Sequence, residues 1–156
     1  MPDSYTVVRT TTITAPAEFI YGLIGDFHGW TTWSPWEDLD PNMQRTYSGP
    51  DSGPGATYVW SGNRKAGEGR MEITEAVPNS SVKIALDFLK PFKSSSTTSF
   101  DLAPDDGGTR VTWTMTGPMT LMTRIMGIFK SMDKMIGPDF EKGLARLKTV
   151  AEQHGS

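Results

Sequence analysis

Side chains that commonly perform acid–base or metal chemistry are scarce in this 156-residue chain, which has two histidines, His28 and His154, and no cysteine. A three-histidine metal site is therefore excluded, and so are disulfides, thiol nucleophiles and thiolate-bound metals. His154 lies two residues from the end of the sequence. His28 could act as a general base, but a loop histidine satisfied by its neighbours is the more ordinary interpretation.

Three acidic residues, Glu37, Asp38 and Asp40, resemble a cation site at first sight. They lack the regularly spaced oxygen ligands and the central glycine of a calcium loop. A solvated acidic turn explains them better, and we expect neither a metal nor a cofactor.

Composition and charge narrow the class of protein. The net charge of −3 and the pI of about 5.3 argue against nucleic-acid binding, because no excess of Lys and Arg is present to neutralise phosphates. No apolar run reaches the ~18 residues of a membrane-spanning helix, and the first residues do not resemble a signal peptide. We expect one cytoplasmic domain over residues 1–156, without integral membrane association.

The tryptophans at 30, 33 and 36 are evenly spaced in the segment "WTTWSPW". A spacing of three suits a 3₁₀-like or irregular turn, in which residues i and i+3 nearly eclipse and the rings stack along one edge. A structural clamp is the favoured interpretation, ahead of a gate at a cavity mouth or a wedge into a membrane. Trp36, nearest the following strands, is kept as a candidate ligand contact.

The helices and strands that position these residues can be predicted from the spacing of apolar residues in the sequence. A β-branched run predicts a strand over 5–13, and the apolar face after Pro16 predicts a short helix that ends at Gly25. Period-two alternation predicts six further strands, at 43–49, 56–62, 70–77, 82–88, 95–102 and 109–117. Apolar spacing of three to four over 119–154 predicts a long amphipathic helix, with a kink or short break at Gly137-Pro138.

The predicted fold class is therefore α+β. A curved antiparallel sheet of about seven strands, with two short helices after the first strand, has one apolar face that the C-terminal helix covers. The side chains on this face, with those of the helix, either complete a core or wall a pocket. Six of nine methionines lie within residues 115–135, and flexible thioethers suit a lining that adapts to apolar ligands. The candidate ligand-binding residues are Trp36, Tyr58, Trp60, Met71, Phe88, Phe100, Trp113, Met115, Met132, Met135, Ile136 and Phe140.

Several segments resemble a known superfamily in the same order along nearly the whole chain. They include "ITAPAEFIYGLIGDFHGWTTWSPWE", "YVWSGNRKAGEGRMEI", "GTRVTWTMTG" and "MDKMIGPDFEKGLARLK". These are similar to the SRPBCC (START/Bet v 1-like, helix-grip) proteins, in particular the polyketide cyclase/dehydrase-like branch. The resemblance implies a hydrophobic cavity between sheet and helix that carries lipids, sterols, quinones, plant hormones or polyketides. Only some members catalyse a reaction, and no catalytic motif matches residue by residue.

Three functions follow as hypotheses. The first is binding or carrying a small hydrophobic ligand such as a lipid, a quinone or a polyketide-like molecule. The second is an enzyme of the cyclase/dehydratase type, which needs an ionisable group inside the cavity. The third is a protein-interaction module with a filled core and an exposed apolar patch. The oligomeric state and the catalytic residues stay open.

Overall fold

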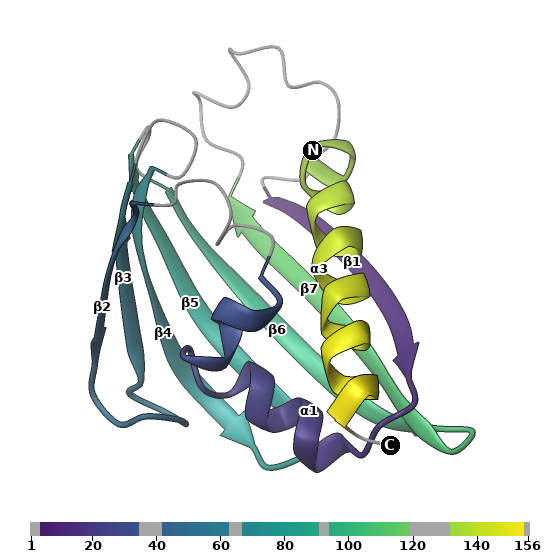
Figure 1. Ribbon diagram of the computed structural model, residues 1–156. Helices are drawn as coiled ribbons and strands as arrows, with labels where there is room; N and C mark the ends of the chain where they lie inside the picture. The colour runs from purple at the N-terminus through teal and green to yellow at the C-terminus, as the bar shows by residue number, and fades with distance from the viewer. Residues whose placement is uncertain (1–3, 35–41, 63–66, 91–93, 119–131, 155–156) are drawn as a thin grey trace.

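The computed structural model describes residues 4–34, 42–62, 67–90, 94–118 and 132–154 (Figure 1). The chain begins with strand β1 (Ser4–Ile13), helix α1 (Ala17–Ile24) and the 3₁₀ helix η1 (Gly29–Thr32). Six more strands follow, and the long helix α3 (Met132–His154) comes last. These strands are β2 (Gln44–Ser48), β3 (Thr57–Ser61), β4 (Glu68–Val77), β5 (Ser81–Lys90), β6 (Ser94–Asp105) and β7 (Gly108–Pro118).

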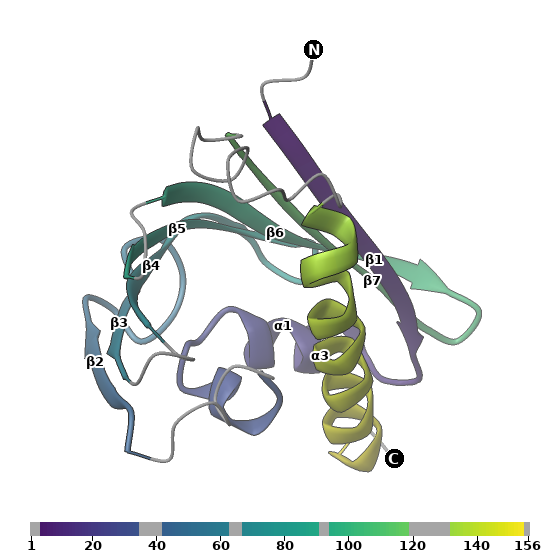
Figure 2. The same ribbon diagram turned by 90° about the horizontal axis from the view of Figure 1, so that it is seen from above.

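The seven strands form one antiparallel sheet in the order β1-β7-β6-β5-β4-β3-β2. The first strand thus pairs with the last, while the remaining strands follow one another as a meander. Seen from above, the sheet curves around the helices, which all lie on its concave side (Figure 2). The predicted α+β helix-grip architecture with seven strands is confirmed.

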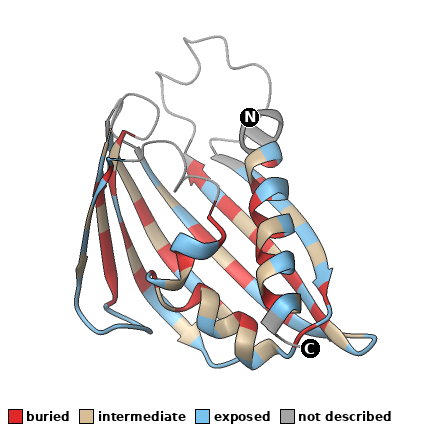
Figure 3. Ribbon diagram, in the orientation of Figure 1, coloured by how far each residue is buried: buried red, intermediate tan, exposed pale blue. Residues whose placement is uncertain are grey.

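Alternation of side chains decides which face of the sheet is buried. On β5, Val82, Ile84 and Leu86 are buried, whereas Lys83 between them is exposed. The same alternation gives the bands of buried and exposed residues along each strand in Figure 3. Because successive side chains of a strand point to opposite faces, the apolar set lies on the concave face, as the sequence predicts.

Helix α1 begins one residue later than the sequence suggests. Pro16 is its N-cap, with an extended backbone (φ −70°, ψ 146°), and Ala17 is the first helical residue. Gly25 ends the helix as predicted, and its N–H donates to the Tyr21 carbonyl at 2.7 Å. Figures 1 and 2 place α1 and η1 over the middle strands and α3 along β1 and β7, so the concave face is shared between them.

Helix α3 is continuous from Met132 to His154 and contains Pro138, so of the predicted kink or short break the break is wrong. Pro138 is exposed, so its ring displaces no packed side chain, although the proline removes one helical hydrogen bond. After Pro138, the apolar stripe of Phe140, Leu144 and Leu147 packs the helix on the sheet. Residues 119–131, where the sequence predicts the start of this helix, lie outside the described residues.

The hairpin between β6 and β7 follows the turn chemistry of its sequence. Asp106 (φ 37°) and Gly107 (φ 82°) both have positive φ, as a two-residue hairpin turn of this type requires. No helix in the described ranges is long and apolar enough to cross a membrane.

Candidate functional site

Five aromatic rings fill the middle of the concave face. We call them the aromatic core: Trp30, Trp33, Phe100, Trp113 and Phe140, all at most 2% exposed. Trp113 stacks face to face on Phe140, with ring centroids 4.0 Å apart and planes 4° apart. Trp33 meets Trp113 edge to face at 5.6 Å, and Trp30 lies 4.7 Å from Trp33. The aromatic core joins the segment after α1 to two strands and the terminal helix.

The two described tryptophans of the "WTTWSPW" segment act as a clamp. Trp30 Nε1 donates to the Ile24 carbonyl at 2.8 Å, and Trp33 Nε1 donates to the Leu23 carbonyl at 3.1 Å. Both acceptors belong to the last turn of α1, where carbonyls lack intrahelical partners. The predicted 3₁₀ turn is confirmed, and the two rings lie in contact but tilted by 44° rather than stacked; Trp36 lies outside the described residues.

Trp113 is also satisfied by the protein itself. Its Nε1 donates to Thr98 Oγ1 at 2.8 Å, and this hydroxyl donates in turn to the Thr114 carbonyl at 3.1 Å. Thr98 is 3% exposed and lies on the inner side of β6. The aromatic core is therefore closed to solvent, and the indole N–H groups of Trp30, Trp33 and Trp113 are all paired within the protein. Its contribution is to the stability of the fold.

The inner face is less tightly covered toward the end of the sheet where β3 and β5 finish and β4 and β6 begin. We call this region the upper inner face; it comprises Tyr58, Trp60, Gly69, Met71, Leu86, Phe88, Ser96 and Gly117. Trp60 and Met71 keep 9% of their surface exposed and Leu86 keeps 8%. One row further into the sheet, Ile73 and Ile84 have none. The apolar side chains at this end are thus buried slightly less completely than those one row further in.

Trp60 is held in a defined position on the upper inner face. It lies over Gly69 of the neighbouring strand, where a Cβ would collide with the indole ring and come within 2.7 Å of the Asp87 carbonyl. Its ring meets Phe88 edge to face at 5.7 Å and lies 6.1 Å from Tyr58. The glycine also coincides with a register shift between β4 and β5, the irregularity expected for a strand glycine.

The structure brings most of the predicted ligand-binding residues to one face but divides them in two. Phe100, Trp113 and Phe140 belong to the aromatic core. The others on strands line the upper inner face or border it: Tyr58, Trp60, Met71, Phe88 and Met115. Met132, Met135 and Ile136 belong to α3, but their side chains, like Trp36, lie outside the described residues.

Three inner-face residues were missed by the sequence reasoning. Ser96 and Thr98 have the same strand parity as Phe100 and Leu102, so alternation alone places both hydroxyls on the concave face. Arg9 likewise shares the parity of Val7 and Ile13. Its side chain is 24% exposed, its Nε donates to Glu141 Oε2 at 2.9 Å, and its guanidinium contacts Gly137 of α3.

Ionisable groups are otherwise confined to the exterior of the described structure. Across the described ranges, the buried polar residues are serine and threonines, and no carboxylate or histidine is among them. No group of three His, Cys, Asp or Glu side chains within these ranges could hold a metal ion. The described inner face therefore offers hydroxyls for hydrogen bonding and no carboxylate or imidazole for proton transfer.

His28 lies at the rim of the domain. Asp26 Oδ1 is 2.8 Å from His28 Nδ1 and accepts the His28 backbone N–H at 2.9 Å. The imidazole stacks on Tyr47 at 4.0 Å, and its side chain is 52% exposed. It borders a pocket of about 210 Å³ that also contains Ser48 and Asp51. Its neighbours satisfy His28, as the simpler interpretation of the sequence expects.

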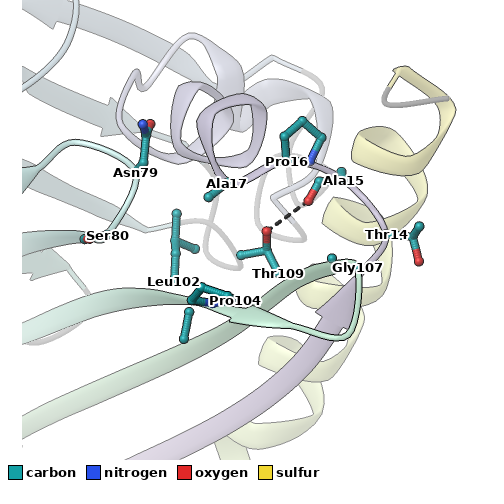
Figure 4. A pocket seen from close by; sticks show the side chains of 12 residues that line it. Thr14, Ala15, Pro16, Ala17, Asn79, Ser80, Leu102, Pro104, Gly107 and Thr109 are labelled. Carbon is teal, nitrogen blue, oxygen red and sulfur yellow. Dashed lines mark hydrogen bonds between the residues drawn. The ribbon is translucent and has the colours of Figure 1, made fainter.

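A larger groove, of about 560 Å³, lies at the opposite end of the sheet from the upper inner face (Figure 4). It runs between the start of α1, the β4–β5 turn and the β6–β7 hairpin. Its lining is formed by residues 14–17, 79–80, 102–104 and 107–109, with no charged side chain. Thr109 Oγ1 donates across it to the Ala15 carbonyl at 2.9 Å. None of the predicted ligand-binding residues lines this groove.

Comparison with protein families identifies the class. Residues 4–152 match the model of the family described as polyketide cyclase / dehydrase and lipid transport. Since the match spans the whole described fold, the chain belongs to this family, and the resemblance to the SRPBCC proteins is confirmed. A search of curated proteins found no significant match.

Solved structures show the same fold at low sequence identity. Protein CV1439 from Chromobacterium violaceum is 16% identical, with a TM-score of 0.67, and the alignment covers 97% of this chain and 99% of that one. The Aha1 protein from Colwellia psychrerythraea, solved as a dimer, is 21% identical with a TM-score of 0.63, covering 94% and 96%. StfQ, a di-domain ARO/CYC protein from the steffimycin biosynthetic pathway, is 12% identical with a TM-score of 0.69, covering 97% of this chain and 51% of StfQ.

Proposed function

We propose that this protein binds a small, largely apolar molecule against the upper inner face, as a carrier or a binding protein. The observation that carries the proposal is the change of exposure along the concave face. The aromatic core in its middle is at most 2% exposed, whereas Trp60, Met71 and Leu86 toward one end keep 8–9% of their surface exposed and Phe88 is half-buried. Exposed apolar surface on an otherwise closed concave face is a common feature of ligand sites.

The chemistry of this surface favours a flat or acyl ligand. Trp60 and Phe88 present rings at 86° to one another, so a ligand that contacts both meets one face and one edge. Removal of apolar surface from water contributes about 25 cal/mol per Å², so burying ~300 Å² contributes about 7 kcal/mol before the losses of association. Lipids, quinones and polyketide-like molecules all have such surface, and the family description supports this range of ligands.

The enzymatic alternative receives less support from the described residues. A cyclisation or dehydration by proton transfer needs an acid or base beside the substrate. The described inner face has the hydroxyls of Ser96 and Thr98 and the ion-paired Arg9, while His28 and Asp26 lie at the rim. Binding without chemistry is therefore the better-supported function.

A neutral fluorescent probe tests the proposal directly. N-phenyl-1-naphthylamine brightens in apolar sites, and we expect saturable binding to the folded protein. Phe88→Ala removes a ring from the upper inner face and should weaken binding about fivefold or more. Leu89→Ala is the matched control, because Leu89 is the next residue on β5 and is 49% exposed.

Two results would contradict the proposed function. One is the absence of saturable binding by the wild-type protein. The other is an equal effect of the two alanine variants, which would place the probe away from the concave face. Circular dichroism of each variant confirms that the fold is retained in the comparison.

A further inference from the structure

The upper inner face contains one polar atom, Ser96 Oγ, whose environment differs from that of the Thr98 hydroxyl on the same strand. Ser96 Oγ is fully buried, and no protein group accepts a hydrogen bond from it or donates one to it. Among the described residues it is the one buried side-chain nitrogen or oxygen of which this is true. Buried polar atoms without partners are rare in native proteins, and each requires an explanation.

Thr98 shows how this fold treats a hydroxyl that serves the structure. Two residues further along the same strand and on the same face, Thr98 Oγ1 accepts from Trp113 and donates to the Thr114 carbonyl. Ser96 has the same orientation without either partner. A hydroxyl in that position is destabilising to the empty protein, because it loses water without gaining a protein hydrogen bond.

The sheet register gives the neighbours of Ser96 on the concave face. Leu86 of β5 lies opposite Ser96 in the sheet register. The β6–β7 pairing places Thr97 opposite Thr116, and continuing that register by one residue sets Ser96 opposite Gly117. Gly117 has no side chain, so Ser96 and Gly117 form the smallest adjacent pair on the upper inner face. The larger Met71 and Tyr58 continue the same row on the other side of Leu86.

From this arrangement we infer that Ser96 Oγ donates a hydrogen bond to a carbonyl oxygen of the bound ligand. The inference rests on the proposed function and narrows it to apolar molecules with at least one hydrogen-bond acceptor, of the ketone, quinone or acyl class. In such a complex the rings of Trp60 and Phe88 contact the apolar body of the ligand. Ser96 fixes its orientation, in the way that a few polar groups orient ligands in apolar sites. A pure hydrocarbon receives the apolar contacts but not the hydrogen bond.

A matched pair of ligands separates the contribution of the apolar contacts from that of the hydrogen bond. 2-Acetylnaphthalene and 2-isopropylnaphthalene have nearly the same shape, but only the first carries a carbonyl. Their affinities are measured by displacement of N-phenyl-1-naphthylamine from the wild-type protein, from Ser96→Ala and from Ser95→Ala. Ser95 is the matched control because it lies next to Ser96 on the opposite, exposed face, where its hydroxyl donates to Asp87 Oδ1 at 2.7 Å.

We expect Ser96→Ala to weaken binding of 2-acetylnaphthalene about 3- to 10-fold, the range of one neutral hydrogen bond. Binding of 2-isopropylnaphthalene should stay within about twofold, and Ser95→Ala should change neither ligand. The melting temperature of Ser96→Ala should equal or exceed that of the wild type, since the variant removes an unpaired buried hydroxyl.

The contradicting outcomes are distinct from those of the proposed function. Equal loss of both ligands in Ser96→Ala, or no loss of the ketone, would overturn the hydrogen bond while the binding function stands. A lowered melting temperature would assign Ser96 a structural role and overturn the inference as well. If the wild-type protein binds neither naphthalene nor the probe, the proposed function and this inference both fail.

Discussion

The ring of Trp113 on β7 lies parallel to the ring of Phe140 on α3, with centroids 4.0 Å apart. Both side chains are almost completely buried, and Trp33 and Phe100 pack edge to face or stacked against the same indole. This pair is the main aromatic contact between the described part of the terminal helix and the sheet. Loss of this contact should therefore destabilise the whole domain.

Replacement of Phe140 by alanine should destabilise the protein by about 3–5 kcal/mol, because it removes a buried ring and leaves a cavity above Trp113. Unfolding in urea, followed by far-ultraviolet circular dichroism, measures the change. Lys142→Ala, an exposed substitution two residues along the helix, should stay within about 0.5 kcal/mol of the wild type. A similar small effect of Phe140→Ala would show that α3 is held by other contacts.

Thr98→Val should cost about 1–3 kcal/mol, although the two side chains have nearly the same shape. The substitution leaves the buried Trp113 Nε1 without the acceptor that it has at 2.8 Å. The matched control is Thr97→Val, which changes an exposed hydroxyl on the other face of the same strand. Urea unfolding of both variants checks the prediction, and equal stabilities would contradict the role of the hydrogen bond.

Gly137→Ala should have opposite effects in two backgrounds. In the wild type, a Cβ at this position collides with the guanidinium of Arg9, which is held by Glu141 and by the Val8 carbonyl. This collision offsets the gain of about 1 kcal/mol expected from replacing glycine by alanine in a helix. In an Arg9→Ala background the collision is gone, and Gly137→Ala should stabilise the protein by up to about 1 kcal/mol.

A double-mutant cycle of these two positions, measured by thermal or urea unfolding, gives the coupling energy. We expect at least about 0.5 kcal/mol, as is usual for residues in contact. Additive effects within experimental error would mean that Arg9 moves aside without cost. The helix would then not depend on glycine where it crosses β1.

The strands could be predicted from the sequence because each has one buried face. Every second residue is large and apolar from Val82 to Phe88 in β5 and from Val111 to Met115 in β7, so type and orientation follow from alternation. The 3₁₀ turn at Trp30 and Trp33 was predictable for a similar reason, since a spacing of three repeats once per turn of that helix. Both predictions depend on local geometry alone.

The division of the inner face into the aromatic core and the upper inner face could not be predicted from the sequence. Trp60 and Trp113 both lie on the inner face of their strands. Trp113 contacts Phe140 and Trp33, whereas Trp60 lies at the end where the face is less completely buried. Which residue is core and which borders a site depends on contacts between segments far apart in the chain. The continuity of α3 through Pro138 was not predicted either, because the packing of Phe140, Leu144 and Leu147 offsets the local cost of the proline.

The pairing of β1 with β7 also affects the order in which contacts form during synthesis. Thr10 lies opposite Thr112, and Trp30 and Trp33 depend on Trp113 and Phe140 for cover. During synthesis the first strand and both tryptophans emerge long before any of these partners, and such long-range contacts form late in folding. The growing chain therefore carries an unpaired β1 until β7 has emerged, and its indoles lack the cover of Phe140 until α3 follows.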